Sequence, residues 1–592
     1  MSAVEICTRS RSAEVEAAAL ALGYSPLQAR IIAGRLGAEQ ADQLAALLQG
    51  GVAQLSPPDG LPDIEKAVEA TTAALRQGLP ILLISDFDAD GASAHAVLKI
   101  AFRDHFGVPE ERLHSYIGHR LRDGYGVSEN LTERILAEAP RPALLITADQ
   151  GSTDHDRIAR LQAAGFIVIV TDHHGVPDAG PPPGAVACVN PVRRDSHFTD
   201  PYIAGVHVAW LYCCAVRQGL LACGLLPANA PKLGSLLDLV ALGTVADCVD
   251  LARSPNNRAL VTRGLQLMNR PQRRPVWTAL AALTRSEGEI DAATLAFRFA
   301  PLINARGRLD SAEDSVRLFL TDSLPEAETL ATVLQEDNEA RKTVQAEMLR
   351  RAQGQVRQQA AAAALCIFDP EGHAGVQGIC AAKLVETTGR PVAFFSPKED
   401  PELISASLRT VGNFHVRRAL AAIAERFPAD FVAWGGHAGA GGVTLRRSAL
   451  ERFAAAWQEL AAQHFGEQTL APRVWTDGTL PGPPSLDLWA EIAALEPFGR
   501  QWEAPLFSGT GEVRELRTVG DGRHLKLSLL MDGAAIDAIW FFASEDGTSP
   551  IQVGEKIRFA YALERNLWRA ETRLQLLIRH AEPGAPASRS MA

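Results

Sequence analysis

The sequence is poor in the features that mark secreted, membrane and zinc-cluster proteins. It has no uncharged run long enough to span a bilayer, and charged residues interrupt the N-terminus before an apolar signal core can form. Eight of its 592 residues are cysteine, and none of them has the C-x-x-C spacing of a zinc or redox site. We therefore expect free thiols, no membrane association and a cytoplasmic location.

An excess of positive charge is also missing. The formal net charge is −11, so a polyanion would have to bind in a locally basic groove against the global field. Hydrophobic residues make up 47% and charged residues 21%, which is ordinary for a globular protein. The length indicates roughly three or four domains.

Acidic residues instead gather where apolar runs end. The run at residues 81–85 is followed by Asp86, Asp88 and Asp90, and the run at residues 143–148 by Asp149. A third run, at residues 166–171, is followed by Asp172, His173 and His174. Apolar runs alternate with helical stretches from about 80 to 190, which predicts a parallel α/β sheet. In such sheets ligands bind at the carboxyl ends of the strands.

These residue types favour a Mn²⁺ or Mg²⁺ site, because they offer carboxylate and imidazole ligands without thiolate. Neighbouring unpaired carboxylates repel each other strongly, and a bound cation removes that cost. Five side chains supply enough ligands for one ion and nearly enough for two: Asp88, Asp90, Asp149, His173 and Asp247. Two such ions form an apparatus for phosphodiester hydrolysis, in which a protonated His174 would contact a phosphate oxygen.

Each of these residues also has a purely structural interpretation. Asp90 could be a helix N-cap, Asp149 a turn residue and Asp247 a buried hydrogen-bonded carboxylate. A His-His pair often lies on the surface or in the core. We favour the metal site because four separate segments contribute to it.

The rest of the chain indicates further domains. Residues 325–360 are charged and contain no proline after Pro325 and a single glycine, which predicts a long connecting helix. A second α/β pattern follows, and its glycine-rich segment 435–442 is either a close-packed turn or a phosphate-binding loop. Alternating apolar residues from about 473 predict a small β-barrel. The expected divisions are 1–75 (helical), 76–324 (first α/β domain), 325–362 (connecting helix), 363–466 (second α/β domain), 473–580 (barrel) and 581–592 (disordered tail).

Several of these motifs, taken in order, resemble those of the DHH phosphoesterase superfamily. They are Asp86-Phe-Asp-Ala-Asp-Gly91, Asp149-Gln-Gly151, Asp172-His-His174 and Gly243-Thr-Val-Ala-Asp247. Gly435-Gly-His437-Ala-Gly-Ala-Gly441 is similar to the motif of the DHH-associated domain. The overall layout, including an OB-type barrel, is similar to that of the bacterial single-stranded-DNA exonucleases of this superfamily.

The resemblance implies a two-metal 5′→3′ exonuclease that acts on single-stranded DNA in recombination and repair, with Mn²⁺ or Mg²⁺. It adds Asp86 to the metal-site carboxylates as a close supporting member, and it makes Asp172 and His174 catalytic. It also implies DNA contacts at Arg120, Arg308, Ser407, Arg409 and His437. Arg306 and Leu408 stand where the family usually has small residues. The expected partners are single-stranded DNA, a helicase and a single-strand-binding protein, and the expected state is a monomer.

Two alternatives stay open at this stage. The first four motifs would also suit a phosphodiesterase that acts on dinucleotides or cyclic dinucleotides, although such a substrate does not need a barrel. A non-catalytic binding scaffold is the second alternative, although this chain keeps every ligand position. Comparing turnover of a dinucleotide with turnover of a long single strand separates the first alternative, and a metal-dependence assay decides the second.

Overall fold

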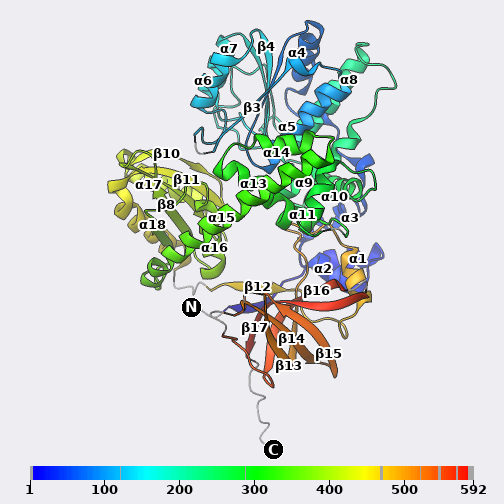
Figure 1. The fold of residues 1–592 in the computed structure, drawn as a ribbon, viewed down its shortest axis with the longest axis vertical. Helices are drawn as coiled ribbons and strands as arrows, with labels where there is room; N and C mark the ends of the chain where they lie inside the picture. The colour runs from blue at the N-terminus through cyan, green and yellow to red at the C-terminus, as the bar shows by residue number, and fades with distance from the viewer. Residues whose placement is uncertain are drawn as a thin grey trace, which may run out of the picture. The chain divides into compact units, whose positions relative to one another are not determined.

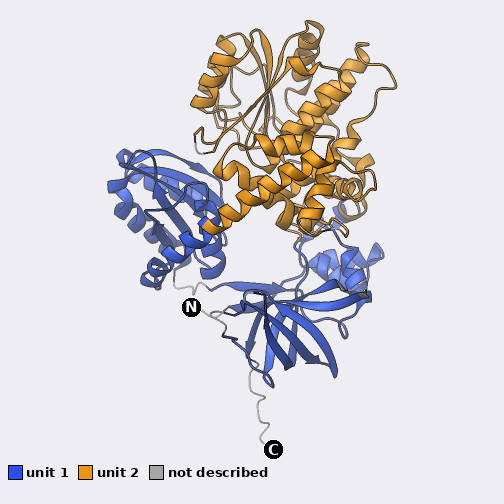
Figure 2. Cartoon of the chain, viewed as in Figure 1, with its two compact units in different colours: residues 1–44, 344–496, 503–592 blue, residues 45–343, 497–502 orange. Residues whose placement is uncertain are grey.

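The computed structural model describes residues 4–120, 122–286, 288–466, 471–520, 522–544, 548–568 and 571–583. The chain forms two compact units (Figure 2). Unit 1 comprises residues 1–44, 344–496 and 503–592, and unit 2 comprises residues 45–343 and 497–502. Within the described residues, none of the helices combines the length and apolar character needed to cross a membrane.

Unit 2 is built on a five-stranded parallel sheet with the order β3-β2-β4-β5-β6 (Figure 1). Its strands are β2 (Ile81–Ser85), β3 (Leu113–Ile117), β4 (Ala143–Ala148), β5 (Phe166–Thr171) and β6 (Ala187–Val189). Every residue of β2 and β4 is buried. These strands are continuous apolar runs because helices cover both faces of the sheet.

The loops after β2, β4 and β5 lie at the same end of the sheet because these strands are parallel, and helices cover both faces. Helices α6 (Glu129–Glu138) and α7 (His155–Ala163) pack on one face through a shared apolar cluster. Helices α4 (Ile64–Arg76), α5 (Ala89–Ile100) and α8 (Gly205–Ala222) contact the strands from the other face. The predicted acidic residues lie in these loops and at the adjoining helix ends.

A helical layer completes unit 2. Its members are α3 (Leu44–Gln49), which begins at the unit boundary, α9 (Leu237–Ala246), α10 (Pro255–Met268), α11 (Pro275–Leu283), α12 (Ala292–Thr294), α13 (Ala300–Leu309) and α14 (Glu313–Leu320). Helix α9 is almost wholly apolar and buried, and it packs against α5, α8 and α10. That packing fixes the position of Asp247 at its C-terminal end.

The predicted long helix is α15 (Leu324–Gln358), which has 35 residues. Its N-terminal part belongs to unit 2 and its C-terminal part, from Val344, to unit 1. Met348 and Ala352 are buried in the core of the second sheet. The rest of the helix is largely polar, which explains why its apolar periodicity is weak.

Unit 1 contains a second five-stranded sheet with the order β10-β11-β9-β8-β7. Its strands are β7 (Leu365–Phe368), β8 (Val392–Pro397), β9 (Leu403–Arg409), β10 (Phe431–Gly436) and β11 (Ala440–Arg446). Only β7 and β8 pair in parallel. Helix α16 (Gln377–Thr388) packs on one face, and α17 (Val416–Arg426) and α18 (Leu450–Phe465) pack on the other.

The C-terminal part of unit 1 is a closed barrel of five strands. They are β13 (Phe507–Val519), β14 (His524–Met531), β15 (Ala534–Trp540), β16 (Lys556–Trp568) and β17 (Glu571–Pro583), and helix α19 (Leu486–Ala493) precedes them. Strand β14 alternates strictly between buried and partly exposed residues. The predicted fold class is therefore confirmed: a parallel-sheet domain, a long connecting helix, a second α/β domain and a barrel.

The N-terminal segment differs from the expectation of short helices alone. Besides α1 (Ala13–Ala21) and α2 (Pro26–Ala33) it contains strand β1 (Glu5–Thr8). This strand pairs in parallel with β12 (Arg473–Thr476), and a four-residue strand whose partner is so distant gives no local signal.

The end of the chain also differs in part. Residues 581–583 of the predicted disordered tail belong to β17, where they pair with β16. Residues 584–592 lie outside the described residues. The predicted domain limits remain a prediction.

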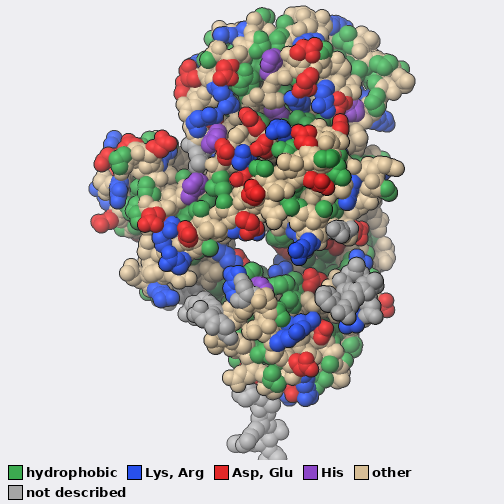
Figure 3. All heavy atoms as spheres, in the orientation of Figure 1, with side chains coloured by type: hydrophobic (Ala, Val, Ile, Leu, Met, Phe, Trp, Pro, Cys, Tyr) green, Lys and Arg blue, Asp and Glu red, His purple; other side chains and the backbone are tan. Residues whose placement is uncertain are grey.

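Charged side chains of both signs are mixed over the face shown in Figure 3, rather than separated into acidic and basic regions. The net negative charge is therefore not concentrated in one acidic region of that face. Local groups of cations can still attract a polyanion.

Candidate metal centre

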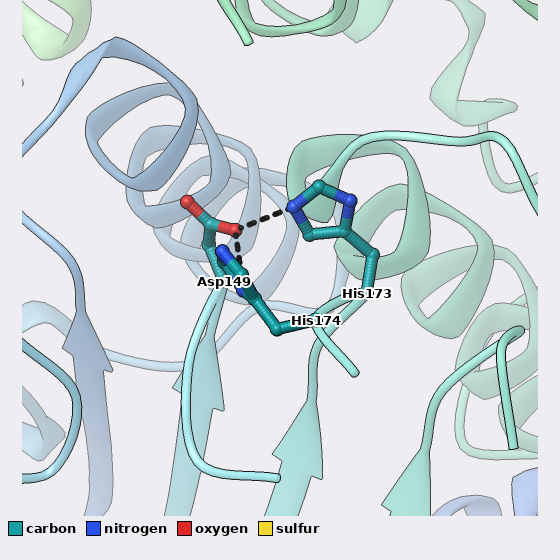
Figure 4. A group of neighbouring side chains, drawn as sticks. All are labelled: Asp149, His173 and His174. Atoms are coloured by element: carbon teal, nitrogen blue, oxygen red, sulfur yellow. Dashed lines mark ion pairs between the residues drawn. The ribbon is translucent and has the colours of Figure 1, made fainter. Parts of the chain in front are cut away.

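The loops at the carboxyl ends of β2, β4 and β5 bring the predicted acidic and imidazole groups together. Three overlapping sets have ligand atoms within 4.8 Å of one another: Asp86, Asp88 and Asp149; Asp90, His173 and Asp247; and Asp149, His173 and His174. In Figure 4 both imidazole rings, from the loop after β5, point to the Asp149 carboxylate at the end of β4. Residues from four separate segments thus converge, as the sequence predicted.

His173 lies at the centre of this group. Its Nε2 is 3.2 Å from Asp149 Oδ1, 3.6 Å from Asp247 Oδ2 and 3.8 Å from Asp90 Oδ2. Its ring also hydrogen-bonds to the backbone of Ile203. Such an outer hydrogen bond fixes the orientation of a ligating imidazole. Sequence patterns do not single out Ile203, because a backbone carbonyl has no residue-type signal.

Asp88 and Asp90 have different local roles. Asp88 is the N-cap of α5, and its Oδ1 accepts hydrogen bonds from the backbone N–H groups of Asp90 (3.0 Å) and Gly91 (3.1 Å). Asp90 is not the N-cap that a purely structural interpretation of the sequence would make it. It accepts hydrogen bonds from Gly205 N (2.8 Å) and Val206 N (2.9 Å). These two groups are at the N-terminus of α8, where the helix dipole favours a carboxylate.

Two glycines allow the helices to approach this closely. A Cβ at Gly205 would lie 2.4 Å from Asp149 Oδ1, and a Cβ at Gly243 would lie 2.8 Å from Asp90 Oδ1. Gly243 begins the motif that ends at Asp247, whereas Gly205 belongs to none of the predicted motifs. Its importance appears only when α8 is placed against β4, so no local pattern could have indicated it.

Asp149 itself has a left-handed backbone, with φ 61°. This conformation is uncommon for a residue with a side chain and costs roughly 1–3 kcal/mol, so it persists only where the surrounding structure enforces it. Here the backbone N–H of Asp149 donates to Thr171 O (3.0 Å), which ties the turn to β5. In this turn Asp149 Oδ1 lies 3.2 Å from His173 Nε2.

Asp172 and His174 form a hydrogen-bonded pair. Asp172 Oδ1 accepts from His174 Nδ1 at 2.8 Å and from the backbone N–H groups of His173 (2.8 Å) and His174 (3.1 Å). Burial alone would raise the pKa of Asp172, but the hydrogen bond and charge of His174 hold it below its ordinary value. Burial would likewise lower the pKa of His174, yet Asp172 and Asp149 raise it to about 10. Asp172 and Asp149 thus stabilise the protonated, cationic form of His174.

Three of the other carboxylates, Asp86, Asp90 and Asp149, are poorly stabilised as anions. Burial, followed by the charge of Asp88, raises the pKa of Asp86 to about 7. Burial, followed by the charge of Asp247, raises the pKa of Asp90 to about 7. Burial and the charges of Asp90 and Asp88 raise the pKa of Asp149 well above its usual range.

Three buried atoms at this point also lack hydrogen-bond partners: Asp86 Oδ1, Asp149 Oδ1 and His173 Nε2. Buried polar atoms are almost always satisfied, so unsatisfied atoms that converge indicate a missing ligand. Asp149 shares one set of ligand atoms with Asp86 and another with His173, so divalent cations at these sets would satisfy the three atoms and offset the repulsion among the carboxylates. The residues present therefore fit such an ion.

Two predicted arginines lie beside this cluster. The guanidinium of Arg120 lies over the ring of Phe87 at 4.3 Å and over that of Tyr125 at 5.0 Å. Burial and the charge of Arg120 lower the pKa of Arg308 to about 10, so the two cations are neighbours. Arg120 in turn helps to lower the pKa of Asp86. The structure thus brings Arg120 and Arg308 close to the acidic residues.

Three predicted residues lie instead in unit 1. Ser407 and Arg409 are on β9, and a Cβ at Gly378 would be 2.9 Å from Arg409 Nη2 and 3.5 Å from Ser407 Oγ, so both side chains face the start of α16. His437 is exposed in the turn between β10 and β11, where its backbone N–H donates to Ala440 O. All three belong to a different unit from the acidic cluster, so their part in its site stays a prediction.

Two positions that depart from the family pattern, Leu408 and Arg306, are accommodated. Leu408 is fully buried in the core of the second sheet, on the face opposite Ser407 and Arg409. Arg306 forms ion pairs with Asp310, Asp314 and Asp337 at 3.1–3.3 Å. On the same helix, Asn304 Oδ1 accepts from the backbone N–H of Ala89 (2.8 Å) and anchors the start of α5.

Comparison with known proteins agrees with this arrangement. Three family models match: the DHH family N-terminal domain at residues 80–244, the DHHA1 domain at 357–463 and the RecJ OB domain at 481–580. The chain is 34% identical over 590 residues to the single-stranded-DNA-specific exonuclease RecJ of Salmonella typhimurium, covering 96% of this chain and 98% of that protein. It is 33% identical over 590 residues to the RecJ of Escherichia coli, with the same coverage.

A solved structure is similar over nearly the whole chain. It is RecJ from Thermus thermophilus in complex with Mn²⁺, with a TM-score of 0.76 and 28% sequence identity. The match covers 98% of this chain and 80% of that one. Together with the identity to the two curated relatives, it shows that the chain belongs to the RecJ family of single-stranded-DNA-specific exonucleases.

Proposed function

We propose that the chain is a metal-dependent exonuclease that hydrolyses phosphodiester bonds of single-stranded DNA in the 5′→3′ direction, in recombination and repair. The single observation that carries this proposal is the convergence of Asp90, Asp149, His173 and Asp247 around unsatisfied buried atoms. The relatives are named as exonucleases of this specificity, and one related structure is titled as a complex with Mn²⁺. The polarity rests on the resemblance alone.

Two ions, Mn²⁺ or Mg²⁺, would be held by Asp88, Asp90, Asp149, His173 and Asp247, with Asp86 in support. When bound, such ions make water nucleophilic at neutral pH and offset the charge on a phosphodiester. Asp172 keeps His174 protonated through their 2.8 Å hydrogen bond. A cationic His174 would then donate to a non-bridging oxygen of the scissile phosphate, where negative charge grows during the reaction.

The substrate would be held by cations outside the metal ligands. Arg120 and Arg308 are next to the acidic cluster and would contact the DNA backbone. The resemblance to the family implies that three further residues contact the DNA: Ser407, Arg409 and His437. Phosphate contacts of this kind are independent of sequence and weaken steeply with salt.

The test is digestion of 5′-labelled and 3′-labelled single strands, with and without Mn²⁺, by the wild type and by Asp149→Ala. We expect metal-dependent release of nucleotides from the 5′ end by the wild type. Asp149→Ala should lose hydrolysis but keep most of its affinity for the strand. Nuclease activity in that variant, or activity in chelator, would contradict the proposal. Hydrolysis of dinucleotides in preference to long strands would favour the small-substrate alternative.

The remaining assignments are proposals of the same kind. We expect a monomer that works in the cytoplasm, where the eight free thiols would stay reduced. An enzyme restricted to single strands needs a source of them, so we propose a helicase and a single-strand-binding protein as partners. Light scattering of the purified protein tests the monomer, and unwinding-coupled digestion of a duplex tests the helicase.

A further inference from the structure

Unit 1 contains a second group of arginines, to which the proposed function assigns no role. A hollow of about 220 Å³ is lined by Thr8, Arg9, Arg11, Arg30, Asp477, Gly478 and Thr479. Sites for drug-sized ligands are usually about 300–1,000 Å³, so this one suits a small group. Three of its seven lining residues are cations.

The hollow is built by the pairing of the two chain segments that form the small sheet. Arg9 and Arg11 follow β1, whose partner β12 leads directly into Asp477 and Gly478. Asp477 N donates to Leu506 O, and Gly478 O accepts from Ser508 N at 2.9 Å, at the start of barrel strand β13. Arg30 belongs to α2. The arginines are therefore held against the barrel within one unit.

The carboxylate in the hollow is already engaged. Asp477 accepts two hydrogen bonds from Arg35, at 2.7 and 3.1 Å, and a third from Leu506 N at 3.2 Å. Both side chains of this ion pair are almost completely buried. The charge of Asp477 is thus balanced mainly by Arg35, which does not line the hollow.

Arg9 and Arg11 have only weakly paired anionic neighbours. Arg9 pairs with Glu503 at 3.4 Å and Arg11 with Glu16 at 3.4 Å, and in both pairs the glutamate is about one-third to one-half exposed. Exposed pairs of this length contribute little. Burial lowers the pKa of Arg30, and the nearby charge of Arg11 lowers it further, whereas Asp477 and Glu16 raise it. An anion between Arg11 and Arg30 would relieve their repulsion.

Some donors of Arg9 and Arg30 are not satisfied. Arg30 Nε, Arg30 Nη2 and Arg9 Nε are buried atoms without a hydrogen-bond partner. A guanidinium presents its donors as a planar fork that matches two oxygens of a phosphate. The hydroxyls of Thr8 and Thr479 line the same hollow and supply further polar groups.

We propose that Arg9, Arg11 and Arg30 form a phosphate-binding site on the barrel side of the N-terminal segment, separate from the acidic cluster. The ligand is a phosphate group, from either the DNA backbone or a free phosphate or mononucleotide. The site goes beyond the proposed function and is tested without hydrolysis, so the failure of one does not imply the failure of the other.

The first arm of the test measures thermal unfolding of the full-length protein in chelator, with inorganic phosphate and with chloride at equal ionic strength. Phosphate should raise the unfolding midpoint of the wild type more than that of Arg30→Gln, because a ligand stabilises only the form that binds it. Arg30→Lys keeps the charge but not the fork, so its response should be intermediate, and it replaces Arg30→Gln if that variant does not fold. Arg426→Gln removes an exposed arginine of the same unit, paired with Glu459, and should behave as the wild type.

The second arm measures binding of a labelled single-stranded oligonucleotide in chelator over a series of salt concentrations. If the phosphate comes from DNA, Arg30→Gln should weaken binding by roughly tenfold and reduce the salt slope by about 0.7, the value for one single-strand phosphate contact. If only the phosphate response differs between variants, the site binds free phosphate or a mononucleotide. Equal phosphate responses and equal oligonucleotide affinities in the wild type, Arg30→Gln and Arg426→Gln would overturn the proposal.

Discussion

In the metal-free protein, the charged forms of different residues in the acidic cluster have opposite effects on folding. Asp86 and Asp90 are buried, and each has a pKa raised to about 7. Their ionisation therefore works against folding. His174 has a pKa raised to about 10 because Asp172 and Asp149 stabilise its cation. Its protonation works in favour of folding.

These directions predict how stability depends on pH without metal. A carboxylate whose folded pKa is raised loses protons less readily when folded, so stability falls as pH rises from about 4 to about 7. A histidine with a raised pKa contributes stability that is complete below about 6.5 and is lost as pH rises through about 10. Both effects lower stability as pH rises. The thermal unfolding midpoint in chelator should therefore be lower at pH 8 than at pH 6.

Adding Mn²⁺ should reverse this trend. The cation binds the deprotonated carboxylates, so it should raise the midpoint by several degrees at pH 8 and by less at pH 6. Thermal unfolding at the two pH values, with and without metal, gives the comparison, and Asp149→Ala is the control that should lose most of the metal response. A larger metal effect at pH 6 than at pH 8 would contradict these pKa directions.

The arginine beside the cluster gives a second prediction at this scale. Arg120→Gln should raise KM for an oligonucleotide by roughly tenfold and change kcat less, because a backbone contact is made in both the ground and transition states. Steady-state hydrolysis at two salt concentrations measures both constants. Arg122→Gln removes a neighbouring exposed arginine that pairs with Asp123, and is the matched control. A change confined to kcat would place Arg120 in the chemical step instead.

At the scale of elements, the site depends on how closely α8 approaches β4. The N-terminus of α8 donates two hydrogen bonds to Asp90, and the absence of a side chain at Gly205 leaves room for Asp149. An added methyl group would displace either the helix or the carboxylate. The geometry of the cluster is therefore set by helix–strand packing as well as by the loops.

Gly205→Ala tests this dependence. We expect hydrolysis to fall by about 100-fold or more, since a displacement of about 1 Å in a catalytic group can have that effect. Metal-induced stabilisation should fall in parallel. Gly234→Ala, in the same unit, places its Cβ in open space and should leave both measurements unchanged. Full activity in the Gly205 variant would show that α8 yields at little cost.

The elements also show what could be predicted from sequence. The strand-end carboxylates were predictable because apolar runs and the residues after them are adjacent in the chain. Gly205, Asn304 and the Ile203 carbonyl were not, because each acts on a segment far away in sequence. The same reason hides β1, which is defined by its pairing with β12.

At the largest scale, a short segment near the C-terminal end of the chain, residues 497–502, belongs to unit 2 rather than to unit 1. Residues 497–502 pack in unit 2, where Pro497 O accepts from Arg258 Nη1 at 3.2 Å and Arg500 O accepts from Leu251 N at 3.1 Å. Trp502 is completely buried there, with the guanidinium of Arg258 4.6 Å from its ring centre.

Trp502→Ala should therefore destabilise unit 2. Truncating a buried tryptophan costs about 3–5 kcal/mol, so the unfolding midpoint in denaturant should fall clearly. Trp475→Ala is the matched control, because that side chain is 43% exposed. Equal midpoints for the two variants would mean that the segment adds nothing to unit 2.

The path of the chain between the two units has a practical consequence for dissecting the protein. The backbone passes from one unit to the other after residues 44, 343, 496 and 502. A single break in the gene therefore cannot yield either unit intact. Expression of either unit would need its separate segments to be joined by new linkers or co-expressed, and truncation from either end would first remove residues of unit 1.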